Sequence, residues 1–75
     1  MNVLFFASIA EYTGTESITL EPVRNTVELK NTLQKIYPRL GEYSYAIAVN
    51  YVVTQNNTDL AETDEIAILP PFSGG

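Results

Sequence analysis

The chain contains one convincing amphipathic helix, over the segment NTVELKNTLQKIYP. Four apolar residues follow the i, i+4, i+7, i+11 spacing of a single buried helix face: Leu29, Leu33, Ile36 and Leu40. Asn25 or Thr26 caps its start, because a short side-chain oxygen there accepts a free backbone N–H. Pro38 ends it, since the residue before a proline avoids helical geometry. A single helix covers only one face of a sheet, so any sheet in this chain keeps its second face open.

The N-terminal segment NVLFFA, residues 2–7, predicts a strand that is apolar on both faces. Alternation places Val3 and Phe5 on one side, and Leu4 and Phe6 on the other. Such a strand is buried on both sides, or buried on one side and covered by a partner on the other.

Five further segments complete the pattern. SIAEYTG predicts a brief helical turn ending at Gly14, and TESITLEP predicts a strand paired with the first and stopped by Pro22. AIAVN and YVVT predict two strands about a tight turn at Asn50, and EIAIL predicts a last strand. Between these last strands, Leu60 is the expected anchor of a polar loop. The order of elements predicts one two-layer α+β domain over residues 1–75, with a sheet of about five strands and the main helix on one face.

Composition removes several classes of function. The chain has no cysteine and no histidine, so it contains no serine–histidine or cysteine–histidine machinery and no thiolate ligand for zinc. The net charge of −5 argues against nucleic acid binding. Asp59, Glu62 and Asp64 lack the regular spacing of a calcium loop, so we expect no metal site. No apolar run approaches the roughly 20 residues of a membrane span, and MNVLFF is not a secretory signal, which predicts a cytoplasmic protein.

Charge is unevenly distributed along the chain. The acidic residues near the C-terminal end either steer a basic partner towards the tail or only maintain solubility. All four basic residues lie in one middle stretch: Arg24, Lys30, Lys35 and Arg39.

The last residues, ILPPFSGG, predict an extended functional tail over residues 70–75. Pro70 and Pro71 stop the preceding strand and fix the direction in which the chain leaves it. The six residues after Leu69 reach about 20 Å when extended. Phe72 and Ser73 then lead to Gly74 and Gly75, which have no Cβ and so enter a narrow channel. A terminal glycine carboxylate, once joined to AMP, is an unhindered acyl group that other enzymes act on.

The sequence resembles the small, sulfur-carrying subunit of molybdopterin synthase, in the MoaD/ThiS-like family of the ubiquitin-like β-grasp group. The resemblance covers nearly the whole chain, through VLFFA, Glu11, Gly14, TVEL, AVN and DEIAILPPFSGG. Its most specific part is PP-x-[ST]-GG at the terminus. Relatives often have arginine where this chain has Ala10.

The resemblance implies a β-grasp fold and a carrier that is not catalytic alone. Gly75 is then adenylated by a ubiquitin-activating-like adenylyltransferase that uses ATP, and a sulfurtransferase supplies the sulfur of a C-terminal thiocarboxylate. The carrier binds no permanent cofactor. It donates sulfur to a pyranopterin precursor, forming the dithiolene of molybdopterin, within a heterotetramer of two small and two large subunits. By position, Phe6, Val53 and Leu69 lie on the face that binds the large subunit.

Other functions fit parts of the same pattern. Gly-Gly alone also fits a sulfur carrier for thiamine thiazole synthesis or a ubiquitin-like modifier conjugated to lysines. A non-covalent β-grasp interaction module with incidental glycines is a further alternative. Simple core packing is the alternative for Phe6, Val53 and Leu69, and a solvated charge for Glu11.

Overall fold

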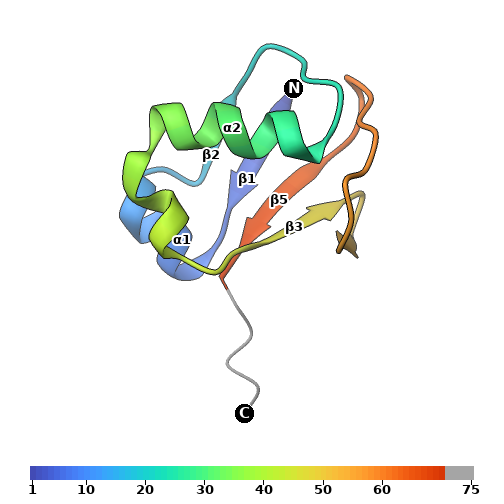
Figure 1. Ribbon diagram of the computed structural model, residues 1–75. Helices are drawn as coiled ribbons and strands as arrows, with labels where there is room; N and C mark the ends of the chain where they lie inside the picture. The colour runs from blue at the N-terminus through green and yellow to red at the C-terminus, as the bar shows by residue number, and fades with distance from the viewer. Residues whose placement is uncertain (71–75) are drawn as a thin grey trace.

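Five short strands form one sheet in the order β2-β1-β5-β3-β4, with helices on one of its faces (Figure 1). The structure is a computed structural model that describes residues 1–70. Its elements follow in chain order: β1 (Asn2–Phe5), α1 (Ala7–Thr13), β2 (Ser17–Thr19), α2 (Thr26–Ile36), the 3-10 helix η1 (Pro38–Glu42), β3 (Ala46–Val49), β4 (Val52–Thr54) and β5 (Ile66–Leu69).

The sheet is mixed, because the first and last strands lie side by side at its centre. β1 pairs with β5 in parallel, and β1–β2, β3–β4 and β3–β5 are antiparallel. A parallel pair needs a crossover, and the segment containing α2 supplies it by passing over one face of the sheet (Figure 1). The predicted α+β class, with one main helix packed on a sheet of five strands, is confirmed.

The start of α2 is held by two asparagines. Asn25 is the cap: its side-chain oxygen accepts a hydrogen bond from the backbone N–H of Glu28 at 2.9 Å. Asn57, from the loop after β4, accepts a second one from the N–H of Val27 at 3.1 Å. Both bonds satisfy donors that the first turn of a helix leaves free.

The predicted buried stripe of α2 is correct at its start and wrong at its end. Leu29 and Leu33 are fully buried, whereas Ile36 is 46% exposed. Pro38 stops the helix, and the next residue on the core side is Tyr37, whose ring packs edge-on against Phe5. Leu40 is fully buried, but it reaches the core from η1.

The core lies between the sheet and the helices. One face of each central strand contributes to it. In β1, Val3 and Phe5 share a face, as the alternation predicted, and this face is the one that points into the core. β1 ends at Phe5 rather than at residue 7, because α1 begins at Ala7. The buried hydrophobic cluster comprises Val3, Phe5, Ile9, Leu29, Leu33, Leu40, Ile47, Ile66 and Ile68.

Two predicted turns are confirmed. Gly14 ends α1 in the left-handed conformation (φ 77°), and its N–H bonds to the carbonyl of Ala10 at 2.9 Å. Between β3 and β4, Asn50 is left-handed with φ 50°, and the next residue, Tyr51, is left-handed as well with φ 71°. The predicted anchor Leu60 packs against the core.

Candidate functional site

The face of the sheet opposite α2 contains a shallow apolar groove. Register places one residue from each of four adjacent strands in a row across this face. Leu4 pairs with Ala67, Ala67 with Ala48, and Ala48 with Val53. The two central residues are alanines and the two outer ones are larger, so the middle of the row is low. The resulting hollow has a volume of about 210 Å³.

Two larger apolar side chains line the groove at the end of β5. Phe6 follows β1 directly, is 45% exposed, and its N–H bonds to the carbonyl of Ile68 at 3.2 Å. Leu69 is the last residue of β5 and lines the same groove. Ala7 is left-handed (φ 48°), so the chain turns away immediately after Phe6 and leaves this ring at the groove.

The structure therefore brings together the three residues predicted to bind a partner. Phe6, Val53 and Leu69 come from three different parts of the chain and line one hollow. Phe6 and Val53 are 45% and 43% exposed, which is unusual for side chains that a core would absorb. The volume suits one or two inserted side chains better than a small-molecule ligand, whose pockets occupy roughly 300–1,000 Å³.

Two residues at the other end of the groove were not predicted. Among residues 1–70, Tyr51 and Glu65 complete its lining and are its only polar members. The Glu65 carboxylate raises the pKa of the Tyr51 hydroxyl, first by accepting its hydrogen bond and then through its negative charge. Sequence reasoning missed this pair because the two residues lie on separate loops. The one available signal was a bulky residue directly after the turn residue Asn50.

A network of hydrogen bonds fixes the two loops that supply this pair. The side chain of Asn50 donates to Asp64 at 2.9 Å and accepts from the N–H of Glu65 at 2.9 Å. Asp64 also accepts from the N–H of Ala61 at 2.8 Å. These bonds to the carboxylate lower the pKa of Asp64, that from Ala61 contributing most. The turn after β3 and the loop before β5 are thus tied together at the rim of the groove.

The predicted tail follows the opposite end of the groove. Pro70 is half-buried and comes directly after Leu69. The other predicted tail residues, Pro71, Phe72, Ser73, Gly74 and Gly75, lie outside the described residues.

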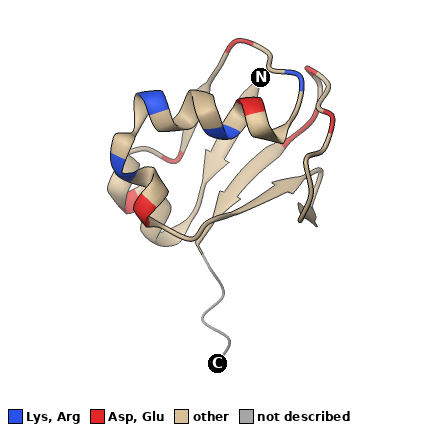
Figure 2. Cartoon of the chain, viewed as in Figure 1, with Lys and Arg blue, Asp and Glu red and all other residues tan. Residues whose placement is uncertain are grey.

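The acidic loop before β5 lies towards the start of that strand (Figure 2). It contains Asp59, Glu62, Asp64 and Glu65. The residues after Pro70 lie outside the described ones, so an acidic surface beside the tail stays a prediction.

Three residues of the resemblance lie in or next to α1, beside the groove. Ala10, where relatives have arginine, is half-buried and helps to line a neighbouring depression together with Phe6 and Glu16. Glu11 is exposed. Gly14 ends the helix and so has a structural role.

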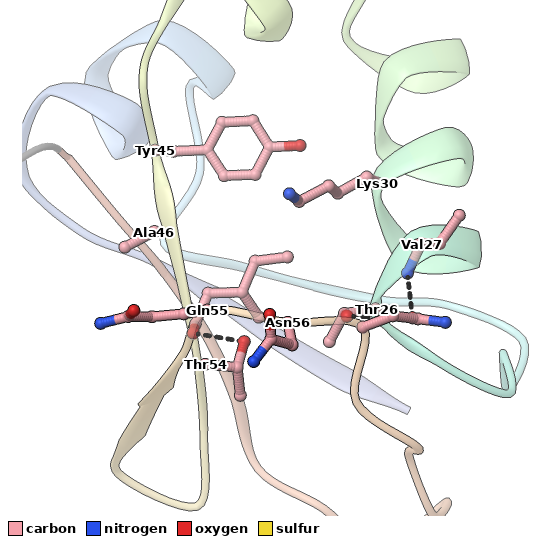
Figure 3. A pocket seen from close by; sticks show the side chains of 10 residues that line it. Thr26, Val27, Lys30, Tyr45, Ala46, Thr54, Gln55 and Asn56 are labelled. Atoms are coloured by element: carbon pink, nitrogen blue, oxygen red, sulfur yellow. Dashed lines mark hydrogen bonds between the residues drawn. The ribbon is translucent and has the colours of Figure 1, made fainter.

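A small polar pocket on the other side of the sheet is part of the fold. It holds about 100 Å³ between the first turn of α2 and the strands β3 and β4 (Figure 3). Thr26 bonds to Asn57 at 3.3 Å and accepts from the N–H of Thr58 at 3.0 Å, so these lining groups satisfy one another. Burial raises the pKa of Tyr45, another lining residue.

Residues 1–70 contain neither a cluster of metal ligands nor a membrane-spanning helix. No group of three histidine, cysteine, aspartate or glutamate side chains in this part of the chain is placed to hold a metal ion. Within the same residues, every helix is too short or too polar to cross a bilayer.

Comparison with known proteins gives matches along the full chain. The ThiS family model matches residues 3–75. The molybdopterin synthase sulfur carrier subunit of Mycobacterium tuberculosis is 31% identical, over 100% of this chain and 96% of the relative. The subunit of the same name from Dictyostelium discoideum is 36% identical, over 97% of this chain and 93% of the relative. The subunit of the same name from Homo sapiens is 31% identical, over 100% of this chain and 93% of the relative.

Solved structures show the same fold. The small archaeal modifier protein 1 of Methanosarcina acetivorans superposes with a TM-score of 0.81 at 26% identity, covering 99% of this chain and 94% of that one. SAMP1 of Haloferax volcanii gives a TM-score of 0.80 at 22% identity, covering 99% and 97%. The ubiquitin-like β-grasp fold implied by the resemblance is therefore confirmed.

Proposed function

The chain belongs to the ThiS family, and from that premise we propose that it is the sulfur carrier subunit of a molybdopterin synthase. One observation supports the proposal above all others. Relatives with that name align with this chain along nearly their whole length, at 31% to 36% identity. The likeness therefore includes the C-terminal segment in which the proposed chemistry takes place.

The reactive group of the proposal is the carboxylate of Gly75. A carboxylate is a poor electrophile, so an activating enzyme first joins it to AMP from ATP and releases pyrophosphate. Sulfur at the oxidation level of sulfide then attacks the acyl carbon, the bond to AMP breaks, AMP leaves, and the product is a thiocarboxylate. Dividing a difficult transfer into two covalent stages is the general advantage of group carriers. This chain has no cysteine or histidine, so the terminal sulfur is the nucleophile that it supplies.

The proposed acceptor of the sulfur is a pyranopterin precursor. The thiocarboxylate sulfur attacks a carbon of a pyranopterin precursor and displaces an oxygen substituent from it. Water then hydrolyses the acyl–sulfur bond, so the sulfur stays on the precursor and the carrier regains its carboxylate. We propose that the large synthase subunit holds the precursor, and that two small and two large subunits form the assembly. The groove supports this role, because Phe6 and Val53 are exposed apolar side chains at one hollow.

Activation is tested by mass spectrometry. The purified chain is incubated with its activating enzyme, ATP and a sulfur donor, and its intact mass is measured. We expect one oxygen to be replaced by sulfur, and a variant lacking Gly75 to keep its mass. A chain whose mass stays unchanged under conditions that activate a known carrier would rule out this chemistry.

Docking is tested with a pair of substitutions in β4. Val53→Glu puts a charge into the groove, whereas Val52→Glu puts the same charge on the neighbouring residue, which is 66% exposed and outside the groove. We expect Val53→Glu to weaken binding of the large subunit about tenfold or more, because a buried unpaired charge is costly. Val52→Glu should bind like the wild type, and both variants should keep their melting temperature. Equal binding by Val53→Glu and the wild type would place the interface elsewhere.

A protein modifier is the second candidate. The likeness to the small archaeal modifier protein 1 of Methanosarcina acetivorans, at 26% identity, favours it. Under this alternative the activated Gly75 forms an amide with a lysine of another protein. Lysates containing a tagged chain would then show covalent adducts that survive denaturation and disappear when Gly75 is deleted. A pure sulfur carrier would give no such adducts.

A further inference from the structure

The turn between β3 and β4 contains a residue in an unfavourable conformation. Two-residue hairpin turns of this kind need positive φ at both central positions, and Asn-Gly is the usual pair. Here the second position is Tyr51, with φ 71°. For a bulky residue this region of backbone space is a genuine outlier, and such outliers gather at functional sites.

The fold itself does not account for this tyrosine. The side chain is 87% exposed, so burial within the chain compensates little of the strain. The other turn residue is different, because the left-handed Asn50 bonds to Asp64 and Glu65 and so has a structural purpose. What distinguishes Tyr51 is its position at the rim of the apolar groove, beside Glu65.

The same end of the groove is negatively charged. Glu65 is the one carboxylate that lines it, and no lysine or arginine among residues 1–70 does so. The two ion pairs within that range, Arg24–Glu28 and Arg39–Glu42, involve α2 and η1 and leave Glu65 without one. Basic residues lie on and beside the helices and most acidic residues in the loops (Figure 2), so the described part of the chain places no lysine or arginine at this rim.

We propose that Tyr51 and Glu65 together bind an arginine side chain of the protein segment that occupies the groove. The inference rests on the proposed function, in which that segment belongs to the large synthase subunit. A guanidinium stacks on a tyrosine ring and at the same time donates two parallel hydrogen bonds to a carboxylate. Tyr51 and Glu65 line the same end of the groove, so the ring and the carboxylate can contact the same occupant. The occupant is therefore apolar over Ala48 and Ala67, and cationic at the start of β5.

The first test separates binding from folding. Tyr51→Gly removes the ring and supplies the residue that the turn prefers, so we expect the melting temperature not to fall. Binding of the large subunit, measured by calorimetry, should weaken about fivefold, as expected for the loss of an exposed aromatic anchor. A purely structural tyrosine would give the reverse result, with lower stability and unchanged affinity.

The second test concerns the charge. Glu65→Gln should weaken binding about threefold at low salt and less at high salt, because screening reduces a rim interaction. The matched control Glu62→Gln removes the same charge from the same loop outside the groove and should bind like the wild type. Glu65→Gln is also combined with alanine substitutions of the large subunit's arginines, one at a time. For one of these arginines, the losses of binding free energy from the two substitutions should not add.

The outcomes distinguish this inference from the proposed function. If Val53→Glu abolishes binding while Tyr51→Gly and Glu65→Gln bind like the wild type, the groove is the interface but the arginine assignment is wrong. If the wild-type chain does not bind the large subunit, the proposed function fails and this inference with it. A wild-type dimer that Val53→Glu dissociates would place a second copy in the groove and would also overturn the assignment.

Discussion

Gly14 allows α1 to end after seven residues. Its φ of 77° is a conformation that residues with a Cβ adopt only at a cost, although an added Cβ there would meet no other atom within 4 Å. We expect Gly14→Ala to lower the free energy of unfolding by about 1 kcal/mol, through backbone strain alone. For a domain of this size, that corresponds to a fall in melting temperature of about 4–8 °C.

Gly41→Ala is the control for this substitution. An added Cβ there would lie 2.9 Å from Oε1 of Gln34, which is the far end of a flexible side chain that can move. We expect a change within about 0.5 kcal/mol, the usual range at surface positions. A loss at Gly41 equal to that at Gly14 would show that strain at positive φ is not the cause. Chemical denaturation of both variants decides the matter.

At the scale of single residues, predictions from the sequence were correct where the periodicity of a strand decides on which face a side chain lies. The strand period of two placed Phe5 and Phe6 on opposite faces correctly, because the pleat alone fixes this, and the resemblance placed Phe6 on the partner-binding face. The helical period failed for Ile36, because Pro38 ends the helix and Tyr37 fills the place beside Phe5. The position of Tyr51 at the groove was also not predicted, because it depends on how β3, β4 and β5 pair.

Two asparagines that lie far apart in the sequence stabilise the start of α2. Asn25 accepts from the N–H of Glu28, and Asn57 accepts from that of Val27. We expect Asn25→Ala and Asn57→Ala each to cost about 1 kcal/mol, because each leaves a helix donor without its partner. Urea denaturation monitored by circular dichroism measures both.

Asn56→Ala provides the matched control. Within residues 1–70 the Asn56 side chain makes no hydrogen bond, although it is adjacent to Asn57 and exposed. Its loss should change stability by less than about 0.5 kcal/mol. An equal loss at positions 56 and 57 would assign the effect to the loop rather than to the helix cap. The sequence predicted a cap at Asn25 or Thr26, and missed Asn57 because its partner lies 30 residues away.

The loop before β5 depends on an ionised carboxylate. Hydrogen bonds from Ala61 and Asn50 lower the pKa of Asp64 from its ordinary value of 3.8. A group whose pKa is lowered by folding contributes stability above its unfolded pKa and loses it as the pH falls through the folded pKa. We expect Asp64→Asn to lower stability at neutral pH, and to make the decline in stability below pH 3.8 shallower.

Acid titration of the melting temperature tests this expectation. Glu62→Gln, in the same loop, removes a carboxylate of equal charge and should leave the acid limb of the curve as in the wild type. Identical acid limbs for Asp64→Asn and the wild type would show that Asp64 does not contribute to the pH dependence. The network also positions Glu65, so a loosened loop should weaken the proposed contact at the groove.

On the scale of the whole molecule, the predicted two-layer arrangement was a consequence of having one long helix and several short strands. A single apolar helix face had to leave one sheet face open, and the alternation in β1 already placed Leu4 and Phe6 together on one face, which is the open face in the structure. The sequence did not reveal the hollow. Its depth depends on the alignment of Ala48 with Ala67, which are small residues without any individual signal.

Strand order predicts how stability is distributed. β1, β5 and β3 are interior strands and contribute buried core residues, whereas β2 and β4 are edge strands of three residues each. Amides of the interior strands should exchange with solvent only through global unfolding, and those of the edges through local opening of lower free energy. Native-state hydrogen exchange resolved by residue measures both sets.

The Gly14→Ala variant turns this expectation into a quantitative test. Because it lowers the free energy of global unfolding, the exchange free energies of β5 amides should fall by the same amount of about 1 kcal/mol. Those of β4 should not change, since local opening at that edge does not involve the end of α1. If the amides of β5 exchanged with solvent as fast as those of β4, the predicted distribution of stability among the strands would be wrong. The groove would then lack a rigid floor under Ala67, and the tail would not follow the most protected strand of the sheet.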